Sequence, residues 1–414
     1  MSKKKKKNTK TIKQNPPSTS HVIKPKAIIT RIKVVGVGGC GGNVVSRMME
    51  GDRMRGVEFI AINTDAQDLD RVMAHRKIYV GKALTRGLGA GMNPEIGKQA
   101  AEENRSEIGE VLNGADIVFV VAGMGGGTGT LGSSVVAEIA KEKGILTVAM
   151  VTKPFAFEGS QRMALAQDGL NRLKDKVDSL IVIPNDRVFT LVDKDTPLLK
   201  AFGFVDGVLK QAVSAISDLV NAPGIINVDF ADIKAILKDA GMTLIGIGEA
   251  SGQDRSMKSV NTAVNSPLLE ISVDGAKGVL FSVAGGKDLK MSEVNDVAKA
   301  VTANLDPNAK VIFGAYQDRG LKEKSMRVTV IATGFSGVLS GSRLNTPTLF
   351  FNSESPRAIT VEEPIGKKEK PATQSKEDRE REKVRDARED RERKQEIGEQ
   401  EPWEIPAFLR KKKK

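Results

Sequence analysis

The sequence predicts an α/β protein with a doubly wound, Rossmann-like domain, a long central helix and a smaller α+β domain with a mixed sheet. Apolar runs typical of buried strands alternate with helical patterns from residue 27 to about 222. Glycine-rich segments follow several of these runs. Between residues 243 and 333, four further strand-like runs are separated by two helical stretches, so a second domain with another topology is expected there.

Composition divides the chain into five parts. We expect a disordered basic arm (1–26), a ligand-binding α/β domain with its central helix (27–222), an α+β domain (223–341), a charged disordered linker (342–402) and a terminal peptide (403–414). The arm and the linker have too few apolar residues to bury a core. The terminal peptide carries the only tryptophan of the chain, Trp403, and further apolar residues up to Leu409, which is typical of a short motif that folds on a partner.

Charge and rare residues exclude several classes of protein. The net charge of +12 comes from the ends: residues 1–33 carry +11, residues 345–414 carry +2, and the body between them carries −1, so no nucleic-acid-binding face is expected. One cysteine and two histidines exclude a disulfide framework and a multi-cysteine zinc site, and we assign no metal ligands. No apolar run reaches the roughly 18 residues of a membrane span. We therefore expect a cytoplasmic protein.

The first glycine loop admits two interpretations. A strand at 27–37 leads into Gly36, Gly38 and Gly41, which satisfy the GxGxxG pattern of dinucleotide-binding folds, and a helix is expected at 44–50. The next strand, 57–62, is followed by Asp65, which would then bind a ribose; the alternative is that Asp65 caps the helix expected at 67–74. The pattern alone is weak, so both interpretations stay open.

Two more glycine segments point to one phosphate-rich ligand. A strand at 77–80 precedes the segment 85–94 and a helix at 95–112; a strand at 117–121 precedes AGMGGGTGT, residues 122–130, and a helix at 135–141. Glycines let backbone N–H groups approach an anion, and a following helix dipole favours its charge. Because the carboxyl ends of parallel strands meet at one edge of a sheet, the three segments converge there. The GxxxxGK[ST] motif of P-loop NTPases is absent.

The remaining elements carry fewer local signals. Strands are expected at 146–151 and 180–183, and a long helix at 197–221; the second domain adds a helix at 233–240, strands at 243–247, 278–284, 310–314 and 327–333, and helices at 254–264 and 291–303. Glu158 and Arg162 are spaced for an ion pair on one helix face. Asp229 and Asp232 are spaced for an N-cap and a first-turn acid, although two such carboxylates could also bind a cation or polarise a water.

Taken together, the motifs resemble the FtsZ family of bacterial tubulin homologues. The resemblance covers residue 28 to the end and rests on GVGGCGGN (36–43), NTDAQ (63–67), GLGAGMNPE (87–95), ADIVFVVAGMGGGTGT (115–130), NVDFADIK (227–234) and EIPAFLR (404–410). It implies a tubulin/FtsZ-like fold and a self-assembling GTPase that forms head-to-tail filaments of the division ring, with GTP or GDP and Mg2+ bound. The presence of both GGGTGT and NVDFAD in one chain argues against the alternative of a nicotinamide-dependent enzyme. A nucleotide-binding scaffold that polymerises with weak hydrolysis remains the alternative.

The resemblance also implies residue roles. Phosphate contacts fall to Gly41, Gly42, Asn43, Gly127, Thr128 and Gly129, with Ala90 and Gly91 near the γ-phosphate; Glu158 and Arg162 bind ribose or phosphate, Phe202 stacks on guanine and Asp206 hydrogen-bonds the base. Asn227, Asp229 and Asp232 form a catalytic loop that completes the site of the neighbouring subunit. Trp403–Arg410 would dock membrane-tether and division-regulator proteins at the division site. Leu131, Gly207 and Cys40 depart from the usual pattern, and we expect Leu131 and Gly207 to slow turnover or alter nucleotide affinity.

Overall fold

The computed structural model describes residues 29–50, 54, 56–190, 192, 195–221, 224–266, 273–303, 305–318 and 320–335. Three predicted parts lie outside the described residues: the arm (1–26), the linker (342–402) and the terminal peptide (403–414). Within the described part, every helix is too short or too polar to cross a bilayer.

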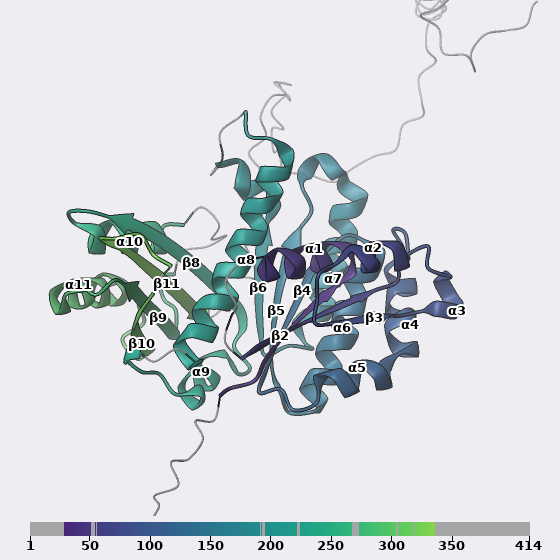
Figure 1. Ribbon diagram of the computed structural model, residues 1–414, viewed down its shortest axis with the longest axis horizontal. Helices are drawn as coiled ribbons and strands as arrows, with labels where there is room; N and C mark the ends of the chain where they lie inside the picture. The colour runs from purple at the N-terminus through teal and green to yellow at the C-terminus, as the bar shows by residue number, and fades with distance from the viewer. Residues whose placement is uncertain are drawn as a thin grey trace, which may run out of the picture. The chain divides into compact units, whose positions relative to one another are not determined.

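In the part of the chain that the structure describes, eleven strands hydrogen-bond in the order β3-β2-β1-β4-β5-β6-β8-β11-β9-β10-β7 (Figure 1). They are β1 (Ile32–Val37), β2 (Val57–Asn63), β3 (Arg76–Tyr79), β4 (Ile117–Gly123), β5 (Leu146–Lys153), β6 (Ser179–Pro184), β7 (Gly224–Ile226), β8 (Gly241–Ser251), β9 (Gly278–Gly285), β10 (Lys310–Gln317) and β11 (Ser325–Thr333). Strands β1 to β6 are all parallel, whereas the second domain mixes both directions. The predicted fold class is confirmed.

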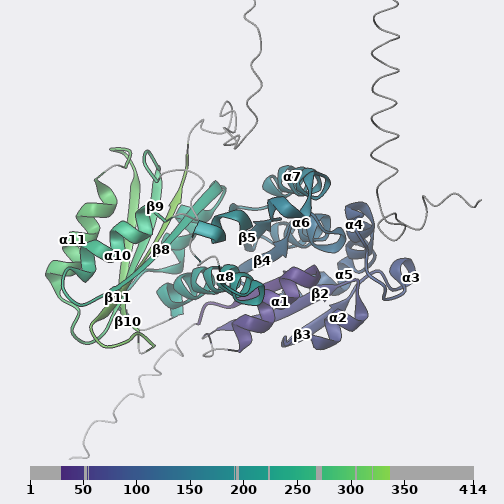
Figure 2. The ribbon, with the colours of Figure 1, turned by 90° about the horizontal axis from the view of Figure 1, so that it is seen from above.

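Helices cover both faces of the parallel sheet. They are α1 (Gly38–Met49), α2 (Ala66–Arg71), α3 (Lys82–Thr85), α4 (Pro94–Glu103), α5 (Arg105–Leu112), α6 (Gly127–Glu142), α7 (Ser160–Lys174) and the central helix α8 (Leu198–Asn221), with 3-10 segments η1 (Ala156–Glu158) and η2 (Asn185–Thr190). Figure 2 shows α1 and α8 on one side of the sheet and α4, α6 and α7 on the other. Strand β1 serves both layers: Ile32 and Val34 belong to the core under α1 and α8, and Val35 and Val37 to the core under α5 to α7.

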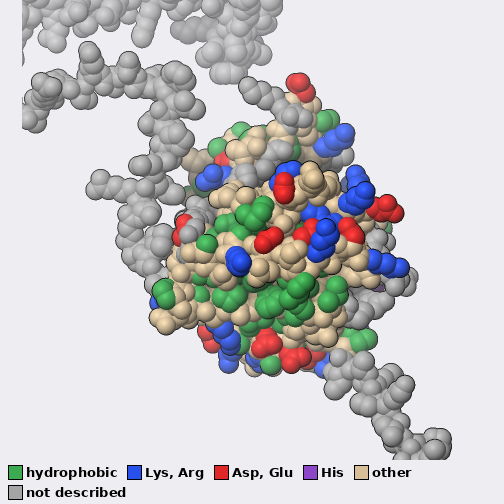
Figure 3. All heavy atoms as spheres, turned by 90° about the vertical axis from the view of Figure 1, so that its left-hand side faces the viewer, with side chains coloured by type: hydrophobic (Ala, Val, Ile, Leu, Met, Phe, Trp, Pro, Cys, Tyr) green, Lys and Arg blue, Asp and Glu red, His purple; other side chains and the backbone are tan. Residues whose placement is uncertain are grey.

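The second domain contains α9 (Phe230–Leu237), α10 (Arg255–Val264) and α11 (Met291–Thr302). Helices α10 and α11 pack with β8, β9 and β11 around a core of their own. Its surface still shows hydrophobic side chains between charged ones (Figure 3), and Met291, Val311 and Phe313 are among its exposed apolar residues. Residues of α9, β9 and β11 also join the core under α8, so the two domains share one apolar interior.

Element boundaries differ from the sequence prediction at several places. Helices α1 and α6 begin at Gly38 and Gly127, so the glycines form first helical turns rather than loops before the helices. The helix predicted at 95–112 is two helices, because Asn104 leaves helical geometry and its side chain accepts a hydrogen bond from Gly81 N–H at 3.1 Å. Strand β1 starts at Ile32, later than residue 27. Helix α3 and strand β7 were not predicted, and the sequence indicated a helix near Arg162 without giving the bounds of α7.

Candidate nucleotide site

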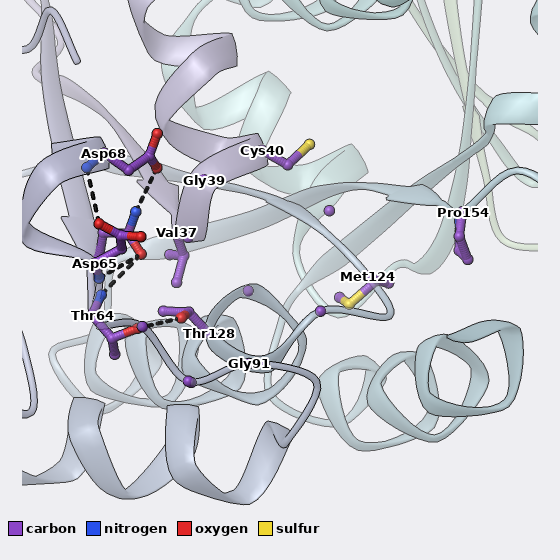
Figure 4. A pocket seen from close by; sticks show the side chains of 18 of the residues that line it. Val37, Gly39, Cys40, Thr64, Asp65, Asp68, Gly91, Met124, Thr128 and Pro154 are labelled. Atoms are coloured by element: carbon purple, nitrogen blue, oxygen red, sulfur yellow. Dashed lines mark hydrogen bonds between the residues drawn. The ribbon is translucent and has the colours of Figure 1, made fainter. Parts of the chain in front are cut away.

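A cavity of about 520 Å3 opens at the carboxyl ends of β1, β2, β4 and β5 (Figure 4). Its lining combines all three glycine segments with side chains of later elements. The lining residues are Val37, Gly38, Gly39, Cys40, Asn63, Thr64, Asp65, Asp68, Leu88, Gly89, Ala90, Gly91, Gly123, Met124, Gly126, Gly127, Thr128, Gly129, Thr152, Pro154, Glu158, Arg162, Asn185 and Phe202. The predicted convergence of the glycine segments at one sheet edge is therefore confirmed.

The first turn of α6 is built to face an anion. Its N-cap, Gly126, makes no side-chain capping bond, so the N–H groups at this helix start are left for a ligand. The chain lies close to this turn: a Cβ on Gly127 would stand 2.9 Å from the Cβ of Ala90 and would overlap the carbonyl oxygen of Gly91. Helix α1, whose N-cap Val37 also lacks a side-chain cap bond, adds a second uncapped helix start.

Hydrogen bonds fix the loops around these helix starts. The hydroxyls of Thr64 and Thr128 lie 2.6 Å apart and point toward each other (Figure 4). Asn63 Nδ2 donates to Asp68 Oδ2 at 2.7 Å, and Asp65 Oδ1 accepts from Asp68 N–H at 3.0 Å. Asp65 therefore caps α2, although it also lines the cavity, and the capping interpretation made from sequence is confirmed.

Glu158 and Arg162 form the predicted ion pair on one wall of the cavity, with Glu158 Oε2 2.8 Å from Arg162 Nη1. Glu158 Oε1 also accepts from Phe155 N–H at 2.8 Å. Arg162 Nε is buried and has no hydrogen-bond partner in the described structure. A buried guanidinium donor without a partner costs free energy, so this wall offers one donor to a ligand.

Asn185 was not among the predicted site residues. It follows β6, lines the cavity and is 8% exposed, and its Oδ1 has no hydrogen-bond partner in the described structure. Phe202 lines the same cavity and is 38% exposed. A cavity lined by both a flat ring and an acceptor without a partner suits a planar group that carries N–H donors. One sequence signal was present at Asn185, the Asn-Asp pair at a strand end, but such a pair is also typical of a turn.

Asp206 lies one turn beyond Phe202 on α8 and is 9% exposed, with Oδ2 3.0 Å from Arg47 Nη1. Burial raises the pKa of this carboxyl to about 6, although Arg47 opposes the rise. Asp206 in turn acts on Cys40, a cavity residue that is exposed to solvent. Desolvation by the neighbouring protein atoms first, and then the charge of Asp206, raise the pKa of the Cys40 thiol to about 11. Asp206 thus lies near the cavity without lining it.

Several other predicted residues lie away from the cavity surface. Gly41 packs against the Val121 carbonyl, Gly42 packs against Val72, and Asn43 is exposed. Leu131 is buried in α6 and lines a separate cavity with Val135, and Gly207 lines a third one, so neither departure from the family pattern enters the nucleotide cavity.

The predicted catalytic loop lies at the other edge of the sheet. Leu237, the last residue of α9, accepts a hydrogen bond from the hydroxyl of Ser179 at 2.7 Å. Ser179 is the first residue of β6, whereas the cavity residue Asn185 follows Pro184, the last residue of this strand. From Phe202 to Asn221, α8 spans about 29 Å at 1.5 Å per residue. At its far end the Asn221 side chain bonds both backbone groups of Thr30, ahead of β1.

The side chains of this loop are available to a partner. Asn227, Asp229 and Asp232 are all exposed. Asn227 Oδ1 accepts from Gly224 N–H at 2.8 Å, and Asp229 is the N-cap residue of α9 but makes no side-chain cap bond. Within the described structure neither Asp229 nor Asp232 pairs with a cation. None of the three residues lines the cavity of its own chain.

The cavity fits a ligand that carries phosphates and a planar base. Two helix starts without a side-chain cap lie at the cavity, Arg162 and Asn185 each keep a buried polar atom without a partner in the described structure, and Phe202 offers an exposed ring. No group of three or more Asp, Glu, His or Cys in the described part could hold a metal by itself. A cation here would be carried mainly by the phosphates, as is usual for Mg2+.

Comparison with known proteins agrees with this geometry. Residues 31–193 match the GTPase domain of the Tubulin/FtsZ family, and residues 241–336 match the C-terminal domain of the FtsZ family. Two solved FtsZ structures from M. jannaschii, an empty dimer and a point mutant, are each 48% identical to this chain, with TM-scores of 0.70. Each match covers 74% of this chain, and it covers 89% of the dimer's chain and 91% of the mutant's chain. The GTPgS-bound protofilament of CetZ2 from Haloferax volcanii shares the fold at 22% identity, with a TM-score of 0.65 over 73% of this chain and 92% of its own.

Proposed function

Because the chain belongs to the FtsZ family of tubulin-like GTPases, we propose that it self-assembles into head-to-tail filaments of the division ring and hydrolyses GTP where two subunits meet. Each subunit would bind GTP or GDP in its own cavity. The observation that carries the proposal is the separation of Asp229 and Asp232 from that cavity, together with their exposure and, among the described residues, the absence of a cation paired with either carboxylate.

Binding uses the two helix starts and side chains that lie in or near the cavity. The N–H groups of the first turns of α1 and α6 hold phosphates, with Gly91 beside the turn of α6. Arg162 donates to ribose or phosphate. Phe202 stacks on the base, and Asn185 Oδ1 and the Asp206 carboxylate accept from the N1–H and N2–H2 donors of guanine, which adenine lacks.

Hydrolysis needs groups that one subunit alone lacks at its cavity. Asp229 and Asp232 of a second copy would accept hydrogen bonds from the attacking water and hold it in line with the terminal phosphate. Mg2+, when bound to the phosphates, neutralises charge that develops on them. Stacking subunits head to tail brings one copy's loop to the next copy's cavity, because the two lie at opposite edges of the sheet.

The terminal peptide Trp403–Arg410 extends the proposal to partners. Its apolar residues end a highly charged segment, so docking on a membrane-tether or regulator protein would bury them. This contact would hold filaments at the division site in the cytoplasm.

The proposal is tested by GTP hydrolysis per subunit against protein concentration, with light scattering, for the wild type and Asp232→Ala. We expect a rate that rises above a critical concentration together with scattering, and a variant that still binds GTP but loses most of that rate. A rate independent of concentration would place the reacting groups within one chain. Assembly of the wild type without turnover would instead identify a scaffold.

A further inference from the structure

Four phenylalanines form a cluster beside the nucleotide cavity. Phe155 is 1% exposed and lies at its centre: its ring centroid is 4.9 Å from that of Phe157, 5.2 Å from that of Phe189 and 5.4 Å from that of Phe202. Phe202 faces the cavity, whereas Phe157 and Phe189 are 66% and 53% exposed. Neighbouring exposed rings of this size typically mark a contact surface.

The two exposed rings lie on the segments that carry nucleotide-facing polar residues. Segment η1 holds Phe157 next to Glu158, and η2 holds both Asn185 and Phe189. A hydrogen bond clamps the segments together, because Ala156 N–H donates to Asp186 Oδ1 at 3.0 Å. Groups that would bind base and ribose and groups that face solvent therefore belong to one connected unit.

We propose that this phenylalanine cluster, Phe155, Phe157, Phe189 and Phe202, couples base binding to subunit contact: a second copy of the chain packs on Phe157 and Phe189. The inference rests on the proposed function, in which a neighbouring subunit must approach the mouth of this cavity. Base stacking on Phe202 orders the ring packed edge-on against it, Phe155, and through Phe155 the two outer rings.

The other side of the contact comes from the same loop region as the catalytic residues. Ile225 in β7 is 65% exposed and lies two residues before Asn227. When Asp229 and Asp232 of one copy lie at the phosphates of the next copy, Ile225, four residues before Asp229, lies near the mouth of that cavity. An isoleucine and two phenylalanine rings buried together would supply the apolar centre of an otherwise polar interface.

The test is assembly of the full-length Phe157→Ala and Phe189→Ala variants, with Phe204→Ala as the matched control. Phe204 is also on the surface, 40% exposed on α8, but makes no ring contact with the cluster. We expect the critical concentration for GTP-driven assembly to rise about tenfold in each cluster variant and to stay within twofold in the control. Nucleotide affinity, measured below the critical concentration, should change less than threefold. Phe157→Leu, which keeps an apolar side chain, should restore most of the assembly.

Two results would overturn the inference. In one, the cluster variants assemble like the Phe204→Ala control. In the other, nucleotide affinity falls by the same factor by which the critical concentration rises, which would mean that the rings shape the cavity and do not contact a second copy. Thermal unfolding of each variant separates these results from loss of fold. Failure of the proposed function is distinguishable, because it would appear in the wild type and in Asp232→Ala whatever the phenylalanine variants do.

Discussion

Asp206 makes the stability of the nucleotide-free protein depend on pH. Burial raises its pKa from the ordinary 3.8 to about 6, with Arg47 opposing the rise, so the folded chain holds this proton where the unfolded chain has released it. Stability from this group is therefore highest below pH 4, falls as the pH rises from about 4 to 6, and stays lower above that range. The pKa difference of about two units between the unfolded and the folded chain corresponds to up to about 3 kcal/mol in the free energy of unfolding.

Asp206→Asn removes the titration, which isolates the effect. We expect the variant to gain on the wild type by up to about 3 kcal/mol in unfolding free energy between pH 4 and pH 7, measured by urea denaturation without nucleotide. Any constant offset from the altered contact with Arg47 cancels in this comparison. Asp254→Asn, at an exposed carboxylate on the second domain, controls for the loss of one charge. Parallel pH profiles for the wild type and Asp206→Asn would refute the reasoning.

Three further predictions concern the cavity. Asn185→Ala should weaken GDP binding about tenfold and ADP binding much less, since the free acceptor at Oδ1 is lost; nucleotide titrations check this, and equal losses would contradict a role in base recognition. Gly97→Ala should lower both GTP affinity and the unfolding midpoint, because its Cβ would overlap the Gly127 carbonyl, whereas Gly109→Ala, whose Cβ meets only side chains at 3.4 Å or more, should do neither. Cys40, with a pKa of about 11, should react slowly with iodoacetamide at pH 8 and faster as the pH rises, and bound GDP should slow it further; mass spectrometry checks this, and protection absent with GDP would place the nucleotide elsewhere.

The architecture could be predicted because its signals are local. Buried parallel strands are apolar throughout, as in the run 117–121, and each is followed by glycine or a turn. The prediction failed where a long-range contact ended an element. Apolar residues keep helical spacing across Asn104, from Ala100 to Ile108, but the bond from Gly81 N–H to the Asn104 side chain replaces helix geometry there.

The site could be predicted only in part, for a similar reason. Spacing in the sequence identifies the Glu158–Arg162 pair and the glycine segments, and the structure places the pair and most of the predicted glycines in the cavity lining, whereas Gly41 and Gly42 lie outside it. Asn185 does not, because an asparagine at a strand end is as typical of a turn as of a ligand contact. Its role emerges from an orphaned, buried oxygen that only the fold creates.

The assignment of Asp229 and Asp232 to a second subunit depends on α8, which is held at both ends. Near the cavity, Asp206 pairs with Arg47 of α1; at the far end, Asn221 bonds both backbone groups of Thr30. The helix therefore cannot slide along the sheet without breaking one of these contacts. Spacing in the sequence cannot show this, because the chain from Phe202 to Asp229 would be long enough to fold back on the cavity if it were not helical. Because α8 is held at both ends, the carboxylates stay exposed and away from the cavity of their own chain, and for this reason we propose that they act on another copy.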